Sequence, residues 1–266
     1  MPIQDKLMTA DNLLSTPCHW VLCVPTRLLS EPELMAQKRE EWLSAEEIQR
    51  MDRFRKEEDR HRYGLAHIVK RFCLSNLLSL KSQDLCFGEG PKGKPFCENS
   101  GAPFFNISHS GDWVLFGVSS FGELGVDVES FQREIGDGIA AYVLNRPQID
   151  KVNTSPEPKK TFMCYWTQKE AMTKTLGFGL SIDFKTVNCS GELGLSAQKH
   201  NGSSLLVDSY LMADDYIVST ATLAKEPLVL YCVEQWNELG FAVVKYTGFG
   251  ERVHFAGDNI VCSDCP

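Results

Sequence analysis

The sequence predicts an α+β protein with two similar halves. A segment with the pattern of a long helix is followed by short apolar strands over residues 45–129, and the same order returns over residues 160–223. Long helices that precede runs of strands, instead of alternating with single strands, are typical of the α+β class. No clear sequence identity links the two copies, so only the order of elements repeats.

The first half opens with a predicted strand at residues 19–24 and an acidic helical stretch at 31–42. Ser44 is followed three residues later by Glu47, which is the signature of a capping box at a helix start. We therefore expect a long helix from residue 45, either continuous or broken into two near Gly64.

Three strands are predicted next, at residues 104–108, 113–119 and 124–129, with a turn at Gly111-Asp112 between the first two. In the third strand Asp127 and Glu129 alternate with aliphatic residues. Because side chains alternate across a strand, both carboxylates should point to one face.

The second half begins after residues 145–160, whose content of Pro, Asn, Ser and charged residues predicts a loop or a poorly ordered connection. A buried helix is predicted over TFMCYWTQKEAMTKTLGFG, ending at Gly177 or Gly179. Further strands are expected at residues 184–188, 204–211 and 216–223. Two more apolar β-like runs lie within 228–247.

Composition limits the classes of function. The chain has 266 residues, 43% of them hydrophobic, and a net charge of −8, so a nucleic-acid partner is not expected. No long apolar run and no basic-then-apolar start occur, which predicts a cytoplasmic protein without membrane contact. The ten cysteines are expected to be reduced and mostly buried. Cys262 and Cys265 lack a second ligand pair nearby, so a zinc site is not expected there.

Two patterns could carry chemistry. Asp127 and Glu129 would repel each other unless a cation lies between them, and oxygen ligands suit Mg²⁺. A solvent-facing polar edge is the alternative. Glu170 and Lys174 are four residues apart and therefore neighbours on one helix face. They could complete a metal site and meet phosphate charge, or form a plain surface ion pair.

A third pattern is Asn106-Ile107-Ser108-His109-Ser110, which could hold an anion or contain a structural histidine. Ser108 or Ser110 with His109 could also suggest a hydrolase, although chain neighbours rarely reach triad geometry.

Five blocks occur in order: RFRKEEDRHRYGLAHIVKRF, GKP, FNISHSGDWVLFGVS, GVDVE and WTQKEAMTKTLGFGLSIDF. In this combination the chain resembles the phosphopantetheinyl transferases of the surfactin-synthetase-activating (Sfp) type, over about residues 44–223. The resemblance implies two similar α/β halves related by a pseudo-twofold, each a helix packed on a small, mainly antiparallel sheet, with a ligand cleft between them. We place the halves at residues 1–125, on the adenosine and 3′-phosphate side of coenzyme A, and 126–266, with the metal-binding and catalytic helix.

The resemblance also implies site residues. The Mg²⁺ ligands would be Asp127, Glu129 and Glu170. The catalytic residues would be Glu170, Lys174 and His109. The contacts to coenzyme A would be Arg50, Arg62, Gly93, Lys94, Pro95, Ser108, His109 and Lys174. Two positions depart from the family pattern: Glu47 stands where a basic residue is common, and Tyr63 where a small hydroxyl residue is common.

The activity implied is Mg²⁺-dependent transfer of the 4′-phosphopantetheine group of coenzyme A to a serine of an apo acyl or peptidyl carrier protein, with release of 3′,5′-ADP. The enzyme is expected to be a monomer, and either Glu170 or a water on the metal would take the serine proton. Two other interpretations stay open: a non-catalytic module that binds coenzyme A or a carrier protein, and a Ser/His hydrolase. The sequence does not choose among fatty-acid, polyunsaturated-fatty-acid, polyketide and nonribosomal-peptide carriers.

Overall fold

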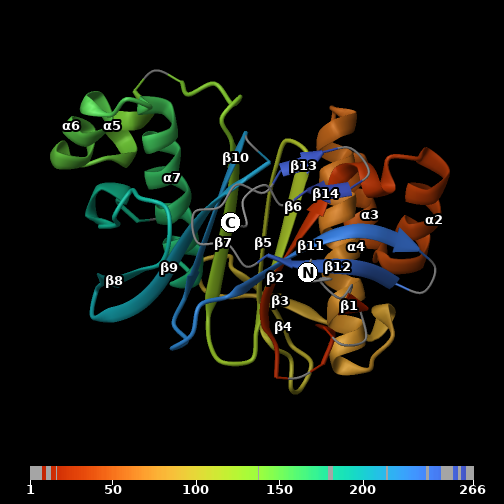
Figure 1. The fold of residues 1–266 in the computed structure, drawn as a ribbon. Helices are drawn as coiled ribbons and strands as arrows, with labels where there is room; N and C mark the ends of the chain where they lie inside the picture. Colours follow the sequence, from red (N-terminus) through yellow and green to blue (C-terminus); the bar gives the residue numbers. More distant parts are fainter. Residues whose placement is uncertain are drawn as a thin grey trace, which may run out of the picture. The chain divides into compact units, whose positions relative to one another are not determined.

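The computed structural model describes residues 8–9, 13–15, 17–136, 138–178, 182–213, 215–237, 240–246, 254–256 and 259–261. The chain divides into two compact units, which are described separately (Figure 1). Unit 1 comprises Met1–Gly90, Pro95–Phe121 and Val229–Tyr246. Unit 2 comprises Pro91–Lys94, Gly122–Leu228 and Thr247–Pro266.

Unit 1 is built on a six-stranded sheet with the order β1-β12-β11-β2-β6-β5. Its strands are β1 (Met8–Thr9), β2 (His19–Pro25), β5 (Phe104–Ser110), β6 (Trp113–Ser119), β11 (Val229–Asn237) and β12 (Gly240–Tyr246). Neighbouring strands run antiparallel except β11 and β2, which are parallel. The strand predicted at residues 19–24 is therefore an internal strand, which explains why every residue after His19 is apolar and buried.

Three helices pack against this sheet and one another: α2 (Pro32–Trp42), α3 (Ala45–Asp52) and α4 (Glu57–Leu78). The predicted capping box is present at the start of α3, where Ser44 Oγ accepts from the Glu47 N–H at 3.3 Å. The predicted break near Gly64 is wrong, because the chain breaks at residues 53–56 instead. Gly64 lies inside α4, and a Cβ atom there would come within 2.7 Å of Met51 Cε on α3. The glycine thus allows two helices to pack closely.

Smaller elements complete unit 1. They are the 3₁₀ helices η1 (Thr26–Leu29) and η2 (Ser82–Asp84) and the antiparallel strands β3 (Phe87–Glu89) and β4 (Pro95–Cys97). Neither β3 nor β4 was predicted. These strands are three residues long, which is too short for a period of two to be recognised.

Unit 2 contains an antiparallel sheet with the order β7-β10-β9-β8. Its strands are β7 (Leu124–Ser130), β8 (Ser196–His200), β9 (Ser203–Met212) and β10 (Tyr216–Thr222), and β13 (His254–Ala256) pairs separately with β14 (Asn259–Val261). The helix α7 (Pro158–Thr175) lies along one face of the four-stranded sheet (Figure 1). Two short helices, α5 (Ile139–Val143) and α6 (Arg146–Thr154), precede α7, and the 3₁₀ helix η4 (Phe184–Thr186) follows it.

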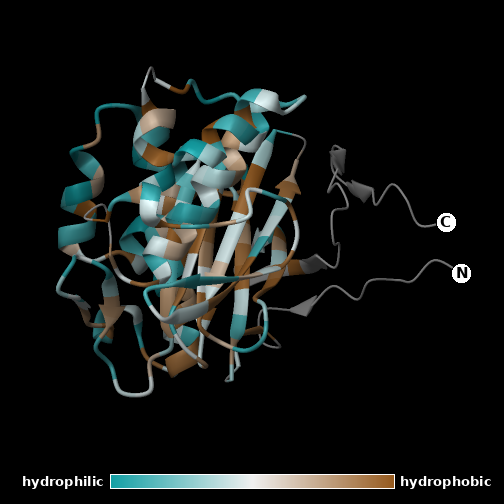
Figure 2. Ribbon diagram, turned by 90° about the vertical axis from the view of Figure 1, so that its left-hand side faces the viewer, coloured by the Kyte–Doolittle hydropathy of each residue, from teal (hydrophilic) through white to brown (hydrophobic). Residues whose placement is uncertain are grey.

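Apolar residues fill the contact between α7 and its sheet. Ala171 and Met172 of α7 are buried with Val207 of β9 and Ala221 of β10. Figure 2 shows the same division across the molecule, with apolar brown on many strand residues and polar teal on the outer turns of the helices. The helix is therefore fixed to the sheet by burial of one face.

The predicted α+β class is confirmed. In each unit a long helix, α4 or α7, packs on a mainly antiparallel sheet. The division of the chain differs from the predicted halves at 1–125 and 126–266. Residues 229–246 belong to unit 1, because β11 pairs with β2 and β12 pairs with β11.

Two local predictions are wrong. The segment 145–160 is not a loop, since Asn145 and Gln148 form a capping box that starts α6, and α7 begins at Pro158. The segment 184–188 is not a strand, since the Asp183 side chain accepts from the Lys185 N–H at 3.0 Å and starts η4. In both places a short polar side chain caps a helical turn.

Among the described residues, no helix combines the length and the apolar character needed to cross a membrane. Five of the eight cysteines in this part of the chain are buried. The prediction for Cys262 and Cys265 lies outside the described residues.

Candidate functional site

The strand β7 carries two carboxylates on the face that meets α7. Asp127 is 5% exposed and Glu129 is 7% exposed, so both are buried. On the neighbouring strand β10 they lie opposite Ser219 and Ile217. A solvent-facing polar edge, the alternative for this pattern, is therefore wrong. Two buried carboxylates this close need compensating positive charge.

Gly125 sets how closely β7 approaches α7. A Cβ atom at this position would lie 2.1 Å from the carbonyl oxygen of Ala171 and 2.7 Å from the backbone nitrogen of Thr175. Both atoms belong to the helix backbone, which cannot move aside as a side chain can. The missing side chain thus brings the last two turns of α7 against the strand that carries Asp127.

Lys174 lies at this close approach. Its Nζ donates to Asp127 Oδ1 at 2.6 Å and to the carbonyl oxygen of Val126 at 3.1 Å. One turn earlier on α7, burial raises the pKa of Glu170 to about 7, and the negative charge of Asp127 adds to the shift while Lys174 opposes it. Glu129 also raises this pKa. Asp127, Glu129, Glu170 and Lys174 therefore interact electrostatically, as the sequence-based hypothesis requires.

Arg133, which the sequence analysis did not single out, joins this group. Its guanidinium forms an ion pair with Glu129 and lies 5.6 Å from the centre of the Trp166 ring. A shallow pocket beside it is lined by Arg133, Ile135, Phe162 and Trp166, among others.

The donor atoms suit a divalent cation. Three carboxylates offer the oxygen ligands that Mg²⁺ prefers, and the charges of Asp127 and Glu129 both act on Glu170. In the described part of the chain, however, no three His, Cys, Asp or Glu side chains converge closely enough to hold an ion as they stand. Lys174 and Arg133 engage two of the carboxylates in this arrangement.

Lys169 is fully buried within α7, with 0% exposure. Its Nζ donates to the carbonyl oxygens of Val143 at 2.9 Å and Phe184 at 2.8 Å, and to Gln148 Oε1 at 2.8 Å. Burial lowers its pKa to about 8. Lys169 thus fastens α5, α6 and η4 to the helix that carries Glu170. The signal in the sequence was a lysine inside an apolar stripe of helical spacing, which indicates a buried cation with acceptors around it.

Ser108 and His109 lie on β5 in unit 1. Ser108 is 7% exposed, whereas His109 is exposed, as expected for adjacent residues that face opposite sides of a strand. This alternation is unfavourable for a Ser108–His109 nucleophile and base pair. An exposed imidazole can meet a ligand from solvent.

Arg62 and Arg50 come from the helices of unit 1. Arg62 donates to the carbonyl oxygen of Gly111 at 3.1 Å and forms an ion pair with Asp59. Arg50 is exposed, and its guanidinium lies 5.8 Å from the centre of the Tyr63 ring. Of the two, Arg50 is the more accessible to an anionic ligand.

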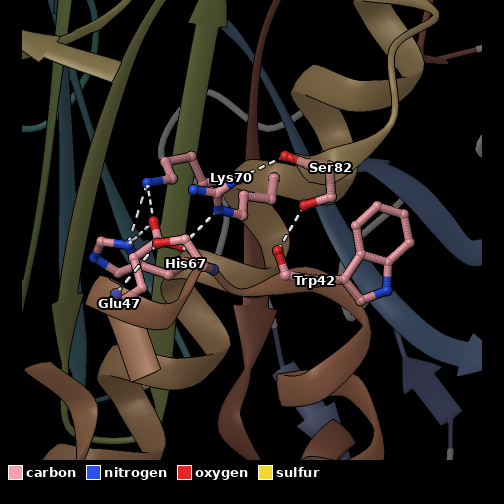
Figure 3. Close-up of polar contacts among 7 residues, drawn as sticks. Trp42, Glu47, His67, Lys70 and Ser82 are labelled. Carbon is pink, nitrogen blue, oxygen red and sulfur yellow. Dashed lines mark hydrogen bonds and ion pairs between the residues drawn. The ribbon is translucent and has the colours of Figure 1, made fainter. Parts of the chain in front are cut away.

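Glu47, one turn before Arg50, is the centre of a buried ion cluster (Figure 3). Its carboxylate accepts from His67 Nδ1 at 2.9 Å, Lys70 Nζ at 2.6 Å and Arg71 Nε at 2.5 Å. Burial alone would raise the pKa of Glu47, but His67 and Lys70 hold it well below the usual range. The acid at this position therefore binds α3 to α4 and is neutralised internally.

The loop Gly93-Lys94-Pro95 connects β3 to β4. Gly93 has φ +81°, a conformation that favours glycine. Lys94 donates to Glu123 Oε2 at 2.5 Å and to the carbonyl oxygen of Leu124 at 2.9 Å. Burial lowers the pKa of Lys94, and Glu123 offsets part of that shift. Lys94 thus already has anionic and carbonyl partners inside unit 2.

The predicted site residues are divided between the two units. Asp127, Glu129, Glu170 and Lys174 lie together in unit 2. Arg50, Arg62, Pro95, Ser108 and His109 belong to unit 1, and Gly93 and Lys94 to unit 2.

Comparison with known proteins supplies the family. A model described as the 4′-phosphopantetheinyl transferase superfamily matches residues 123–221, and a model for the N-terminal part of 4′-phosphopantetheinyl transferases matches residues 34–120. The chain belongs to the 4′-phosphopantetheinyl transferase family. Its β7 and α7, with the four clustered side chains, lie inside the first of these matches.

Three relatives in this family illustrate the degree of similarity. The chain is 33% identical over 144 residues to a putative 4′-phosphopantetheinyl transferase of Synechocystis sp., covering 52% of this chain and 58% of that protein. It is 32% identical over 143 residues to the 4′-phosphopantetheinyl transferase ffp of Bacillus subtilis, and 30% identical over 143 residues to Sfp of Bacillus subtilis strain 168. Each of these two matches covers 53% of this chain and 63% of the relative. The chain thus spans about three-fifths of the length of these curated relatives.

Proposed function

We propose that the protein transfers the 4′-phosphopantetheine group of coenzyme A to a serine of an apo acyl or peptidyl carrier protein, with Mg²⁺ and with release of 3′,5′-ADP. The observation that carries this proposal is the electrostatic interaction of Glu170 with Asp127 and Glu129, together with the hydrogen bond from Lys174 to Asp127, where α7 meets β7. Family membership supports the reaction class. The cluster supports a site built for a pyrophosphate with a cation.

In this proposal Asp127, Glu129 and Glu170 hold the metal. Bound there, Mg²⁺ supplies charge that neutralises the pyrophosphate and stabilises the leaving oxygen. Lys174, whose Nζ donates to Asp127 in the metal-free protein, would donate to a phosphate oxygen of the bound pyrophosphate. Because Gly125 lets α7 lie against β7, the strand and the helix that carry these groups are in place before the substrate arrives.

Glu170 takes the proton of the carrier serine in this mechanism. In the metal-free protein burial raises its pKa to about 7, and a carboxylate oxygen that the metal leaves open can accept the proton. The proton goes to a carboxylate oxygen as the serine oxygen attacks the β-phosphate. The bond from the β-phosphorus to the bridging oxygen breaks, and 3′,5′-ADP leaves.

Coenzyme A contacts are proposed from both units. His109 and Arg50 are exposed and therefore accessible to phosphate groups. Lys94 would have to give up its ion pair with Glu123 before it could bind the 3′-phosphate. Glu47 is an acid that is already neutralised by its ion cluster, so it does not supply the positive charge that this phosphate needs. Arg50 is therefore the proposed main cation for the 3′-phosphate, with Arg62, Ser108, Gly93 and Pro95 in supporting positions.

A monomeric, cytoplasmic enzyme remains part of the proposal. A non-catalytic module that binds coenzyme A or a carrier is the second candidate, and the complete acidic cluster beside Lys174 disfavours it. The Ser/His hydrolase is disfavoured by the opposite orientation of Ser108 and His109 on β5.

Mass spectrometry of apo carrier proteins tests the function. Incubation with coenzyme A and Mg²⁺ should add the mass of the phosphopantetheine arm to at least one carrier in a panel. Asp127→Asn should abolish the addition, whereas the surface variant Asp150→Asn should not. No addition with any carrier, or full activity of Asp127→Asn, would refute the proposal. Release of 3′,5′-ADP separates an enzyme from a binding module.

A further inference from the structure

Arg133 follows β7 at a tight turn. Its backbone N–H donates to the carbonyl oxygen of Ser130 at 3.2 Å, which folds the chain back toward the strand. The guanidinium then forms an ion pair with Glu129. The turn thus places a cation on a carboxylate of the acidic cluster.

The two members of this ion pair differ in exposure. The side chain of Glu129 is 9% exposed, whereas that of Arg133 is 50% exposed. Glu129 is held inside the unit, but Arg133 can move into solvent at little cost. In the pair of Lys174 with Asp127, by contrast, the lysine side chain is only 25% exposed. Arg133 is therefore the more easily displaced of the two cations.

Arg133 has a second interaction partner in addition to Glu129. The guanidinium lies 5.6 Å from the centre of the Trp166 ring, within the range of a cation–π interaction. Arg133 and Trp166 also line the same shallow pocket. An arginine released from its carboxylate would keep the attraction of this ring, so release needs no rearrangement of the backbone.

We propose that Arg133 is an exchangeable counter-ion, which neutralises Glu129 in the metal-free protein and leaves it when a divalent cation binds. The inference rests on the proposed function, because it assumes that Glu129 is a metal ligand. It explains why the three carboxylates do not converge on one point as they stand. Arg133 competes with the ion and so sets the concentration at which the site fills.

Metal binding is the first test. Mn²⁺ prefers the same oxygen ligands as Mg²⁺, and its unbound fraction can be measured by electron paramagnetic resonance. Arg133→Gln should bind Mn²⁺ about two- to fivefold more tightly than the wild type, as expected for loss of a partly exposed competing ion pair. Arg146→Gln, which removes an exposed arginine paired with Asp150, is the control and should bind as the wild type does.

Tryptophan emission is the second test, because it distinguishes displacement from a general effect of charge. Saturating Mg²⁺ should change the emission assigned to Trp166 by comparison with Trp166→Phe, and Arg133→Gln should abolish that change. The inference would be overturned, and the proposed function left standing, if Arg133→Gln bound Mn²⁺ as the wild type does or more weakly. The same holds if Mg²⁺ did not change the emission of Trp166. Failure of the wild type to bind Mn²⁺ better than Asp127→Asn would overturn the metal site itself, and the inference with it.

Discussion

Replacing Gly125 by alanine tests the idea that a missing side chain positions the site. The new Cβ would lie 2.1 Å from the Ala171 carbonyl oxygen, and carbon and oxygen in contact need about 3.3 Å. The helix α7 would have to withdraw by roughly 1 Å. The 2.6 Å bond from Lys174 to Asp127 would then lengthen to about 3.6 Å, beyond the range of a hydrogen bond.

This overpacking should lower the free energy of unfolding by about 1–3 kcal/mol. It should lower the rate of phosphopantetheine transfer by about a hundredfold, since displacement of a catalytic group by about 1 Å has that effect. Urea unfolding and a carrier-modification assay measure the two quantities. Gly136→Ala is a matched control, because its Cβ would meet only the side chain of Ile139, with the nearest atom, Cδ1, at 3.4 Å. Wild-type stability and activity of Gly125→Ala would refute the reasoning.

Two further predictions concern buried charge. The folded-state pKa of Glu170, about 7, lies above its ordinary value of 4.5, so its contribution to stability is fully present below pH 4.5 and is lost as the pH rises through 7. Without divalent ions, the free energy of unfolding of the wild type should fall by on the order of 1–3 kcal/mol relative to that of Glu170→Gln between pH 4.5 and 8. A difference between the two proteins in urea unfolding that does not change with pH would contradict this. Lys169→Met leaves three acceptors without their donor and should cost about 2–4 kcal/mol in urea unfolding. Lys151→Met, which removes an exposed ion pair with Glu192, should lower the free energy of unfolding by less than about 1 kcal/mol. Equal losses for the two variants would show that the burial of Lys169 does not matter for stability.

Local patterns explain what could be predicted. The alternation around Asp127 and Glu129 fixes which face of β7 they share, and the spacing of Glu170 and Lys174 fixes one helix face. Family resemblance then joined a strand and a helix that lie about 40 residues apart in the sequence, which periodicity alone could not do. The capping box at Ser44 predicted the start of α3 because its two hydrogen bonds are local.

The errors have physical causes as well. In 145–160 the Pro, Asn and Ser residues were interpreted as a loop, although Asn145 with Gln148 carries the same capping pattern as Ser44 with Glu47. Arg133 was missed because its contact with Glu129 depends on a turn that no period describes. The membership of β11 in unit 1 depends on pairing with β2, which precedes it by about 200 residues. Pairing between strands so far apart in the sequence produces no local sequence pattern from which it could be predicted.

The late position of β11 and β12 affects the order in which the chain can fold during synthesis. All four strands of the main sheet in unit 2, with α7, are contained in residues 124–222 and emerge from the ribosome consecutively. The sheet of unit 1 begins earlier but lacks β11 and β12 until residues 229–246 have been translated. Until then β2 has an unpaired edge, which invites intermolecular pairing in a nascent chain. Of the two main sheets, the one that starts first is therefore completed last, and truncation just before residue 229 would damage the sheet of unit 1 most.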